Sequence, residues 1–285
     1  MLTAATIDSA LHLALDEDAP WGDVTGEVFI PAGASARAQL RAREDGVLAG
    51  IEVFARTFAL VDAETTVELR AADGDAFTSG DVLATVHGSA RTVLRAERIA
   101  LNFCQRMSGI ATQTRAYVDA AAGRARIVDT RKTTPGLRAF EKHAVVCGGG
   151  HNHRFGLSDA VMAKDNPLAV LTGEGLSVAE AIRTARARLP HTTMFEVEVE
   201  VDRLDQVPAV LEGGADIIML DNFTPTQLRE GVELVNGRAV VEASGNVTLE
   251  TIPEIAATGV DVISSGALTH SVRAIDLGLD LSLET

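Results

Sequence analysis

Aromatic residues, cysteines and long apolar runs are all scarce in this 285-residue chain, and the last two shortages each argue against a class of protein. The only cysteines are Cys104 and Cys147, which argues against a disulfide scaffold and for a reducing cytoplasm. No run of about 18 apolar residues is present, so no membrane-spanning helix is expected. The first residues lack a basic segment and soon reach acidic ones, unlike a secretory signal. We therefore expect a cytoplasmic protein with no membrane partner.

Positive charge and the common nucleotide-binding motifs are scarce as well. The chain has 25 Lys and Arg against 40 Asp and Glu, a net charge of −15. Sequence-independent nucleic-acid binding depends on cations that face the phosphates, so we expect no nucleic-acid partner. The sequence contains no P-loop, no G-x-G-x-x-G after the first expected strand and no H-E-x-x-H. These absences argue against nucleoside triphosphate, dinucleotide and zinc-protease sites.

Short strand-like segments separated by turns fill the first hundred residues. Apolar residues from Ile7 to Leu15 recur at helical spacing and predict a first helix, which Pro20 and the following glycines should end. Alternation predicts a half-buried strand at 35–43, with further strands at 47–49, 65–71 and 82–86 and a helix at 51–60. A connecting helix is expected from residue 89, interrupted at Ser108-Gly109 and resumed through Ala121. This part is predicted to be a small α+β domain.

Repeated βα units are predicted after residue 123. Short apolar runs with helical patterns between them are typical of a parallel α/β fold. The runs lie at 126–129, 160–163, 194–201, 217–220, 239–243 and 260–264. Two helix starts are marked by capping boxes, at Ser177 with Glu180 and at Thr224 with Gln227.

A charged or glycine-rich group follows each run of the predicted sheet. In parallel α/β sheets and (β/α) barrels, the carboxyl ends of the strands form the face where ligands bind. The groups are Thr130-Arg131-Lys132, Lys164, Glu200, Asp221, Ser244-Gly245-Asn246 and Ser265-Gly266. The sequence therefore predicts one binding face built from distant parts of the chain.

Positive charge is concentrated in residues 129–166. This stretch has a net charge of +2, whereas the rest of the chain carries −17. Fixed positive charge in a cleft attracts anions, and Arg grips carboxylate or phosphate through two parallel hydrogen bonds. We therefore assign Arg131, Arg154, Lys164 and the earlier Arg98 to anionic groups of a substrate.

Glu200 and Asp221 end adjacent predicted strands and are expected to lie close together. Such a pair can bind a divalent metal, hold ribose hydroxyls or stabilise an oxocarbenium ion, and the sequence leaves these roles open. Glu196 and Glu198 alternate with Glu200 on one face and are interpreted as acids paired with Arg.

Glycine loops and histidines complete the candidate site. Ser244-Gly245-Asn246 and Ser265-Gly266-Ala267 follow the last two predicted strands, where backbone N–H groups commonly bind phosphate. The spacing of His151 and His153 argues against a metal pair, because no Cys or third His lies near them. We interpret His153 as a hydrogen-bond donor to a substrate carboxylate.

The segments DTRKTTPGLR and GGGHNHRFGLSDAVMAKDN resemble the quinolinate phosphoribosyltransferase family. The similarity extends from LDEDAPWGDVT to GALTHSVRAIDLGLD, which is most of the chain. It implies an N-terminal α/β sandwich domain over 1–108, onto which the tail 271–285 packs back, and an incomplete (β/α) barrel over 109–270.

The resemblance also implies roles for particular residues. Arg98, in AERIALNF, matches an arginine that reaches into the site of a partner subunit. The acids Glu200 and Asp221 match residues that hold the ribose and Mg²⁺, and together with Lys132 they are the expected catalytic residues. The expected quinolinate- and phosphate-binding set is Thr130, Arg131, Lys132, His153, Arg154 and Lys164, and the expected phosphate loops are Ser244, Gly245, Asn246 and Ser265, Gly266, Ala267.

The implied reaction joins quinolinate to 5-phosphoribosyl 1-pyrophosphate and gives nicotinate mononucleotide, pyrophosphate and CO₂, with Mg²⁺ as cofactor. The implied assembly is a homodimer, and hexamers also occur in the family. Two positions depart from the family pattern, since Pro167 replaces a His and Asn246 replaces a Gly.

Two other functions fit parts of the same pattern. A Schiff-base aldolase would use Lys164 at the end of a barrel strand, but it would not need so many arginines. A binding protein related to those of molybdenum-transport operons would share the fold without catalysis. The combination of cations with Glu200 and Asp221 favours catalysis.

Overall fold

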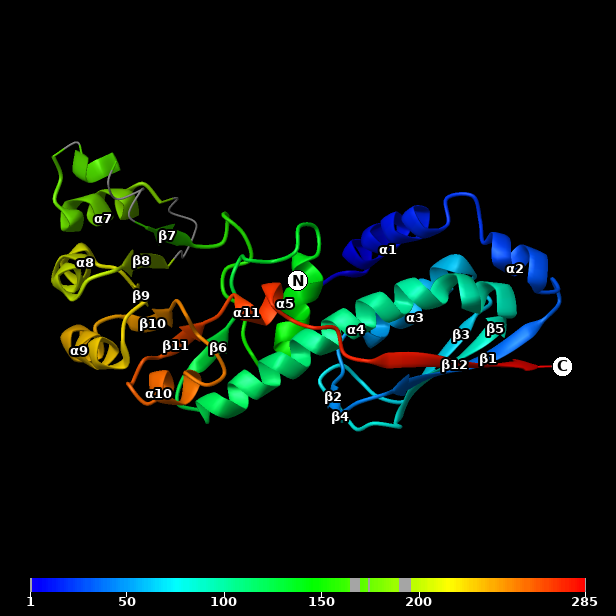
Figure 1. The fold of residues 1–285 in the computed structure, drawn as a ribbon. Helices are drawn as coiled ribbons and strands as arrows, with labels where there is room; N and C mark the ends of the chain where they lie inside the picture. The colour runs from blue at the N-terminus through cyan, green and yellow to red at the C-terminus, as the bar shows by residue number, and fades with distance from the viewer. Residues whose placement is uncertain (1, 165–169, 174, 190–195, 285) are drawn as a thin grey trace. The chain divides into compact units, whose positions relative to one another are not determined.

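The computed structural model describes residues 2–164, 170–173, 175–189 and 196–284 (Figure 1). The chain forms two compact units. Unit 1 comprises Met1–Arg115, Thr133–Gly149 and Leu268–Thr285, and unit 2 comprises Ala116–Lys132 and Gly150–Ala267. The predicted boundary at 108/109 falls within a helix, and unit 1 also takes in the segment 133–149. The proposed division into domains therefore stays a prediction.

An antiparallel sheet is the centre of unit 1. Its order is β12-β1-β5-β3, and β2 and β4 form a separate pair. The bounds are β1 Ser35–Ala42, β2 Gly46–Val47, β3 Thr66–Leu69, β4 Ala76–Phe77, β5 Val82–Ser89 and β12 Leu277–Glu284. β12 pairs with β1 along its whole length, from Leu277 opposite Ala42 to Glu284 opposite Ser35. The last strand of the chain is thus an edge strand beside the first.

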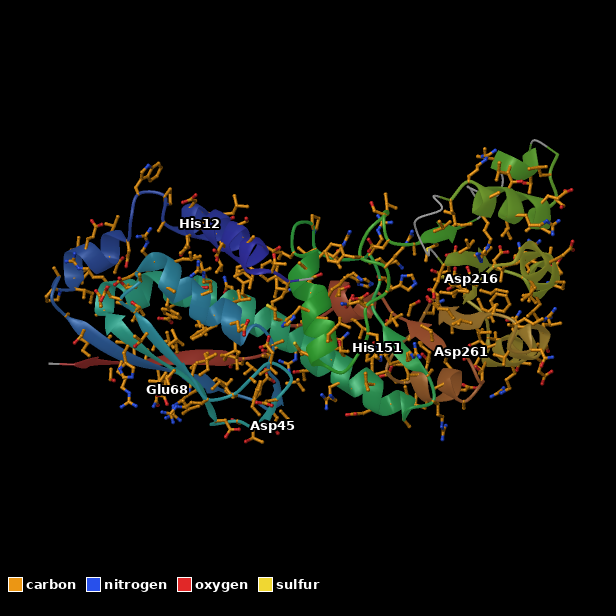
Figure 2. All side chains as sticks on the ribbon, turned by 180° about the vertical axis from the view of Figure 1, so that it is seen from behind. His12, Asp45, Glu68, His151, Asp216 and Asp261 are labelled. Carbon is orange, nitrogen blue, oxygen red and sulfur yellow. The ribbon has the colours of Figure 1, made fainter. Side chains whose placement is uncertain are left out.

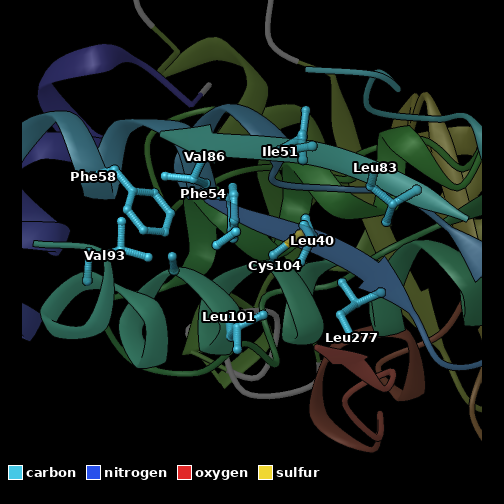
Figure 3. Close-up of a cluster of buried hydrophobic side chains, with 14 of the residues drawn as sticks. Leu40, Ile51, Phe54, Phe58, Leu83, Val86, Val93, Leu101, Cys104 and Leu277 are labelled. Carbon is cyan, nitrogen blue, oxygen red and sulfur yellow. The ribbon is translucent and has the colours of Figure 1, made fainter. Parts of the chain in front are cut away.

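Two helices, α3 Ile51–Val61 and α4 Ala90–Ala121, pack on this sheet. The other helices with residues in unit 1 include α1 Ala4–Asp18, α2 Val24–Phe29 and α5 Arg138–Cys147. Figure 3 shows side chains of α3 and α4, including Phe54, Phe58 and Cys104, packed against Leu40 and Val86 of the sheet. The Phe54 and Phe58 rings meet edge to face with their centroids 5.0 Å apart. This buried apolar cluster holds the antiparallel sheet against the two helices.

Helix α4 corrects the expected interruption at Ser108-Gly109, because it continues without a break from Ala90 to Ala121. Ser108 is fully buried, and its hydroxyl donates to the carbonyl of Ala49 and accepts from the N–H of the same residue. Gly109 lies where a Cβ would come 2.2 Å from the carbonyl oxygen of Arg273. The small residues allow close packing of neighbouring backbone and do not end the helix.

Among the described residues, the sequence did not predict α2, and it did not give the bounds of α5. α2 begins where only chain breakers were expected, and the Asp23 carboxylate caps it by accepting the N–H of Gly26 at 3.0 Å. α5 follows the cationic stretch, and its residues Phe140 and Val145 are buried. Neither has a long enough apolar repeat to be recognised from periodicity alone.

Unit 2 contains a parallel sheet in the order β6-β11-β10-β9-β8-β7 (Figure 1). The bounds are β6 Arg126–Val128, β7 Val161–Ala163, β8 Val197–Val201, β9 Ile217–Asp221, β10 Val240–Ser244 and β11 Val262–Ser264. The last parallel strand, β11, pairs with the first, β6, as in a barrel. Among the described residues β6 and β7 are the two edge strands, and β6 also has an isolated parallel bridge from Val128 to His151. The predicted incomplete (β/α) barrel, preceded by an α/β sandwich, is confirmed.

The described helices that follow β7 are α7 Val178–Ala187, α8 Val207–Gly213, α9 Pro225–Val235, α10 Ile252–Ala256 and α11 Ala267–His270, with a 3₁₀ turn at Leu204–Gln206. Two of them, α7 and α9, begin where the capping boxes predicted. The Ser177–Glu180 and Thr224–Gln227 boxes both have their two reciprocal hydrogen bonds. Each box satisfies backbone N–H groups that the first helical turn leaves unpaired.

Acidic residues at the amino ends of the parallel strands stabilise the sheet. Asp216 and Asp261, labelled in Figure 2, precede β9 and β11. The Asp216 carboxylate accepts the N–H of Val197 at 2.8 Å, and that of Asp261 accepts the N–H of Val241 at 2.8 Å. Acids at this end therefore join neighbouring strands, which leaves the carboxyl ends for binding.

Pro167 and the first residues of the run at 194–201 lie outside the described residues. Within the described ranges, every helix is too short or too polar to cross a membrane.

Candidate active site

A cavity of about 430 Å³ lies at the carboxyl ends of the unit 2 strands. Four cations and three carboxylates are among its lining residues. The lining consists of Thr130, Arg131, Lys132, His153, Arg154, Met162, Lys164, Glu200, Met219, Asp221, Asn222, Glu242, Ser244, Gly245, Asn246 and Ser264. Parallel strands place residues that are distant in sequence at one end of the sheet, where both signs of charge meet.

Four of the predicted site residues do not line this cavity. Arg98 is exposed on α4, in unit 1. Ser265 is buried, and its N–H donates to the carbonyl of Val128 at 3.1 Å. Gly266 and Ala267 follow Ser265 and also lie outside the lining, whereas Ser264, one residue earlier, is part of it. All the other predicted site residues are among the residues that line the cavity.

The cationic side of the cavity is built by the turn after β6 and the loop before β7. The Thr130 hydroxyl accepts the backbone N–H of Lys132 at 3.0 Å, which fixes that turn. Burial, and then repulsion from Arg131, lower the pKa of Arg154. Arg nevertheless stays protonated in proteins, so the cavity is lined by two guanidinium groups that carry like charge. A bound anion would relieve their repulsion.

The acidic side of the cavity comes from β8 and β9, which are neighbours in the sheet. The Lys164 ammonium forms an ion pair with the Glu200 carboxylate. Asp221, the last residue of β9, accepts a hydrogen bond from the side-chain amide of Asn222 at 2.7 Å. The two predicted acids therefore lie on adjacent strands with different partners.

A tight loop closes the cavity after β10. Gly245 and Asn246 both adopt left-handed backbone conformations, with φ of 88° and 52°. A Cβ on Gly245 would lie 2.2 Å from the Asn222 side-chain oxygen, so only glycine fits there. Asn246 also tolerates this conformation, since Asn adopts it more readily than most residues.

His153 lies against two buried carboxylates. Its Nε2 is 3.2 Å from a Glu198 oxygen and 3.4 Å from a Glu242 oxygen. Both carboxylates are 2% exposed. The Nδ1 atom accepts the backbone N–H of Arg154 at 2.8 Å. The ion-pair partner of Glu198 is thus a histidine, which corrects the interpretation of Glu198 as an acid paired with Arg. The role of His153 as a donor to a substrate carboxylate stays a prediction.

The charge of this cluster follows from its burial. Burial opposes a charged imidazole, but hydrogen bonds to Glu198 and then Glu242 raise the pKa of His153 to about 10. Protonation at Nδ1 would break the bond from Arg154, yet two charge-assisted contacts outweigh one neutral bond. Burial, with repulsion from Glu242, raises the pKa of Glu198. The raised pKa of His153 therefore follows from its two carboxylate partners, and that of Glu198 follows first from burial.

Two groups of side chains among the described residues have the donors for a metal ion. One is His153 with Glu198 and Glu242, and the other is Asp73, His143 and Cys147 in unit 1. His151 belongs to neither, in line with the sequence argument against a His151–His153 pair. Asp73 already pairs with His143 at 2.7 Å and accepts the N–H of Ile51, the first residue of α3.

Sequence reasoning missed several lining residues. Met162, Met219 and Ser264 carry no charge, so no electrostatic pattern marks them. Glu242 lies two residues before Ser244, and strand alternation would have placed both on one face of β10. Asn222 directly follows Asp221 and, being uncharged, is not marked by the charge pattern at the strand ends either.

Comparison with known proteins places this site in a family. Residues 23–108 match the N-terminal domain of quinolinate phosphoribosyl transferase, and residues 110–280 match its C-terminal domain. The chain belongs to the quinolinate phosphoribosyltransferase family. The predicted resemblance is therefore confirmed.

Similar family members come from plants and bacteria. A Nicotiana glauca mitochondrial quinolinate phosphoribosyltransferase [decarboxylating] is 44% identical over 98% of this chain and 83% of the relative. A probable nicotinate-nucleotide pyrophosphorylase [carboxylating] of Bacillus subtilis is 42% identical over 94% and 90%. The crystal structure of NadC from Streptococcus pyogenes is 44% identical and superposes with a TM-score of 0.94 over 100% of this chain and 99% of that one.

The fold extends to more distant structures. The nicotinate-nucleotide pyrophosphorylase of Pyrococcus furiosus is 18% identical, with a TM-score of 0.64 over 99% of this chain and 77% of that one. At this identity, the likeness concerns the fold alone. Quinolinate phosphoribosyltransferase family membership therefore rests on the nearer relatives.

Proposed function

We propose that this protein transfers the phosphoribosyl group of 5-phosphoribosyl 1-pyrophosphate to quinolinate with loss of CO₂. The products are nicotinate mononucleotide and pyrophosphate, and the reaction belongs to de novo NAD biosynthesis. The proposal rests on one observation. In this member of the quinolinate phosphoribosyltransferase family, one cavity is lined both by four cations and by two acids at the strand ends, namely Arg131, Lys132, Arg154 and Lys164 with Glu200 and Asp221.

The cations are suited to two anionic reactants held together. Quinolinate carries two carboxylates, and a guanidinium binds a carboxylate through two parallel hydrogen bonds. Arg131 and Arg154 line the same cavity, and the positive charge of Arg131 helps to lower the pKa of Arg154. We assign quinolinate to this pair. Lys132 and Lys164 remain for the phosphates, and the 244–246 loop adds a phosphate-binding edge.

The acids are suited to the transfer step. The quinolinate nitrogen forms a bond to the anomeric carbon of the ribose as the bond to pyrophosphate breaks, so positive charge builds up on the ribosyl ring. Carboxylates placed near that charge stabilise the transition state more than the ground state. Glu200 and Asp221 are the candidates, with Glu200 oriented by its ion pair with Lys164.

Decarboxylation follows from the charge that the transfer creates. The pyridine nitrogen becomes a cation when it bonds to ribose. The neighbouring carbon–carboxylate bond can then break, because the ring cation stabilises the electron pair left on carbon. That carbon takes up a proton, and the product is nicotinate mononucleotide. The protein has to orient the leaving carboxylate, and a fixed arginine pair does so.

Mg²⁺ is the proposed cofactor. Glu200 and Asp221 supply the hard oxygen donors that Mg²⁺ prefers, and this ion commonly uses one or two carboxylates together with substrate phosphates. When bound, it would neutralise charge on the departing pyrophosphate. The residues present therefore fit the ion.

The proposed assembly is a homodimer in which Arg98 of each subunit completes the site of the other. Arg98 is exposed on α4 and is not one of the residues that line the cavity, which accords with this role. We also propose a cytoplasmic location, which accords with the two free cysteines.

One incubation tests the reaction. The purified protein is mixed with quinolinate, phosphoribosyl pyrophosphate and Mg²⁺, and nicotinate mononucleotide and CO₂ are measured. We expect both products in equal amounts. Nicotinic acid replaces quinolinate in the control and should give little product, because it lacks one carboxylate. Tight quinolinate binding without turnover would overturn the proposal and favour a binding protein.

A further inference from the structure

The side chain of Asn222 joins two parts of the cavity rim that are distant in sequence. Its Nδ2 donates to the Asp221 carboxylate at 2.7 Å, and its Oδ1 accepts from Nδ2 of Asn246 at 3.0 Å. The backbone N–H of Asn222 also donates to the carbonyl of Ser244 at 2.9 Å. One residue therefore connects the end of β9 with the loop after β10.

The direction of these bonds is fixed by Asp221. An ionised carboxylate only accepts hydrogen bonds, so the Asn222 amide must present its NH₂ group to Asp221. Its oxygen then faces Asn246, which has to donate. A rotation of either amide would set two donors or two acceptors against each other. The chain of bonds consequently has a single arrangement that satisfies every group.

The backbone strengthens this connection. Asn222 and Asn246 have φ of 61° and 52°, and Gly245 between the partners has φ of 88°. A Cβ on Gly245 would lie 2.2 Å from the Asn222 oxygen and 2.9 Å from its backbone nitrogen. The loop backbone therefore packs directly on Asn222.

We infer that Asn222 is a positioning residue that holds Asp221 and the 244–246 loop at one fixed spacing. This inference rests on the proposed function, in which Asp221 holds the ribose or the metal and the loop holds a phosphate. The ribose and this phosphate are then parts of the same substrate, phosphoribosyl pyrophosphate. Quinolinate is assigned to Arg131 and Arg154, which Asn222 does not contact through any of these bonds.

Glycine substitutions test the inference without straining the backbone. Glycine adopts positive φ readily, so Asn222→Gly and Asn246→Gly remove the side chains from positions that already have this conformation. Asn236→Gly is the matched control. Asn236 has φ of 48°, ends α9 and does not line the cavity. Circular dichroism confirms that each variant is folded.

Steady-state kinetics should separate the two substrates. Loss of one charge-assisted bond raises the KM for phosphoribosyl pyrophosphate about tenfold in Asn222→Gly. Loss of the neutral bond raises it about threefold in Asn246→Gly. The double variant should resemble Asn222→Gly, because both changes break one network. The KM for quinolinate should stay within about twofold throughout, and Asn236→Gly should match the unaltered protein.

Several results would overturn the inference. One is a KM for phosphoribosyl pyrophosphate in Asn222→Gly that equals that of Asn236→Gly, and another is an equal rise for both substrates. If the unaltered protein gives no product, the proposed function fails separately. Calorimetric titration with inorganic pyrophosphate and Mg²⁺ then decides: binding about tenfold weaker in Asn222→Gly supports the inference, and equal binding overturns it.

Discussion

Replacement of His153 by alanine should leave two buried carboxylates without their common partner. Nε2 lies 3.2 Å from Glu198 and 3.4 Å from Glu242, and each carboxylate is 2% exposed. One oxygen of each, Oε1, already lacks a hydrogen-bond partner among the described residues. The variant would therefore retain the cost of burying charge and lose what offsets it.

Two independent estimates give a similar loss in the free energy of unfolding for His153→Ala. Removal of one partner from a buried pair costs about 3–5 kcal/mol. The rise in the pKa of His153 from 6.5 to about 10 corresponds to roughly 5 kcal/mol. We expect the free energy of unfolding at pH 7.5 to fall by about 3–5 kcal/mol in His153→Ala.

The loss should depend on pH. In the unaltered protein, the raised pKa of His153 stabilises the fold fully below pH 6.5, and this contribution disappears as the pH rises through about 10. In the variant, a carboxyl with a raised pKa holds its proton more tightly when folded. Such a carboxyl therefore destabilises the fold as the pH rises above 4.5, the ordinary pKa of a Glu side chain. The cost of His153→Ala should therefore be smaller at pH 5, where the raised-pKa carboxyl of the variant still holds its proton, than at pH 7.5.

Urea unfolding followed by circular dichroism at pH 5 and pH 7.5 measures both effects. Neutralising the two acids, in His153→Ala combined with Glu198→Gln and Glu242→Gln, should restore most of the stability at pH 7.5. The reasoning is refuted if His153→Ala costs under about 1 kcal/mol, or if its cost is the same at both pH values.

Three further predictions follow from other parts of the structure. Arg98→Ala and Lys164→Ala should each abolish turnover, and an equal mixture of re-associated subunits should recover about a quarter of the sites, because random pairing gives half the dimers one intact site. Gly109→Ala should lower the free energy of unfolding by about 1–3 kcal/mol through overpacking, measured in urea. The hydrogen bond with Asp73 raises the pKa of His143 to about 10. Protonated His143 therefore stabilises the fold fully below pH 6.5, and this stabilisation is lost as the pH rises through 10. His143→Gln should reduce the fall in Tm between pH 7 and pH 10.5.

Each of these predictions has a control. No recovery of activity on mixing would show that Arg98 does not complete a neighbouring site. Gly33→Ala adds the same methyl group where no atom lies within 4 Å, so it should cost little; an equal loss at both glycines would argue against overpacking. A change in Tm with pH that is the same with and without the His143 ring would remove the ion pair as its cause.

Much of unit 2 could be predicted from local sequence. Apolar runs located all six strands, and reciprocal Ser–Glu and Thr–Gln pairs located two helix starts. The residues after each strand were then expected at one face, since parallel strands share a direction. Most of the cavity lining follows from that argument.

Long-range packing defeated the local patterns elsewhere. Ser108 and Gly109 look like a helix break, but they are the small residues that let α4 lie against neighbouring backbone. The meaning of a glycine depends on what approaches it, and the approaching segment, around Arg273, is distant in sequence. Propensity alone cannot distinguish a helix stop from a close contact.

The sequence by itself determined which residues end the strands, because strand direction and the two-residue alternation are local properties. It therefore determined that cations and acids would meet at one end of a barrel. Only the tertiary structure decided the pairs: His153 with Glu198 and Glu242, Lys164 with Glu200, and Asn222 with Asn246. Strand order and register bring these side chains together, and both are set by packing between segments that no local pattern connects.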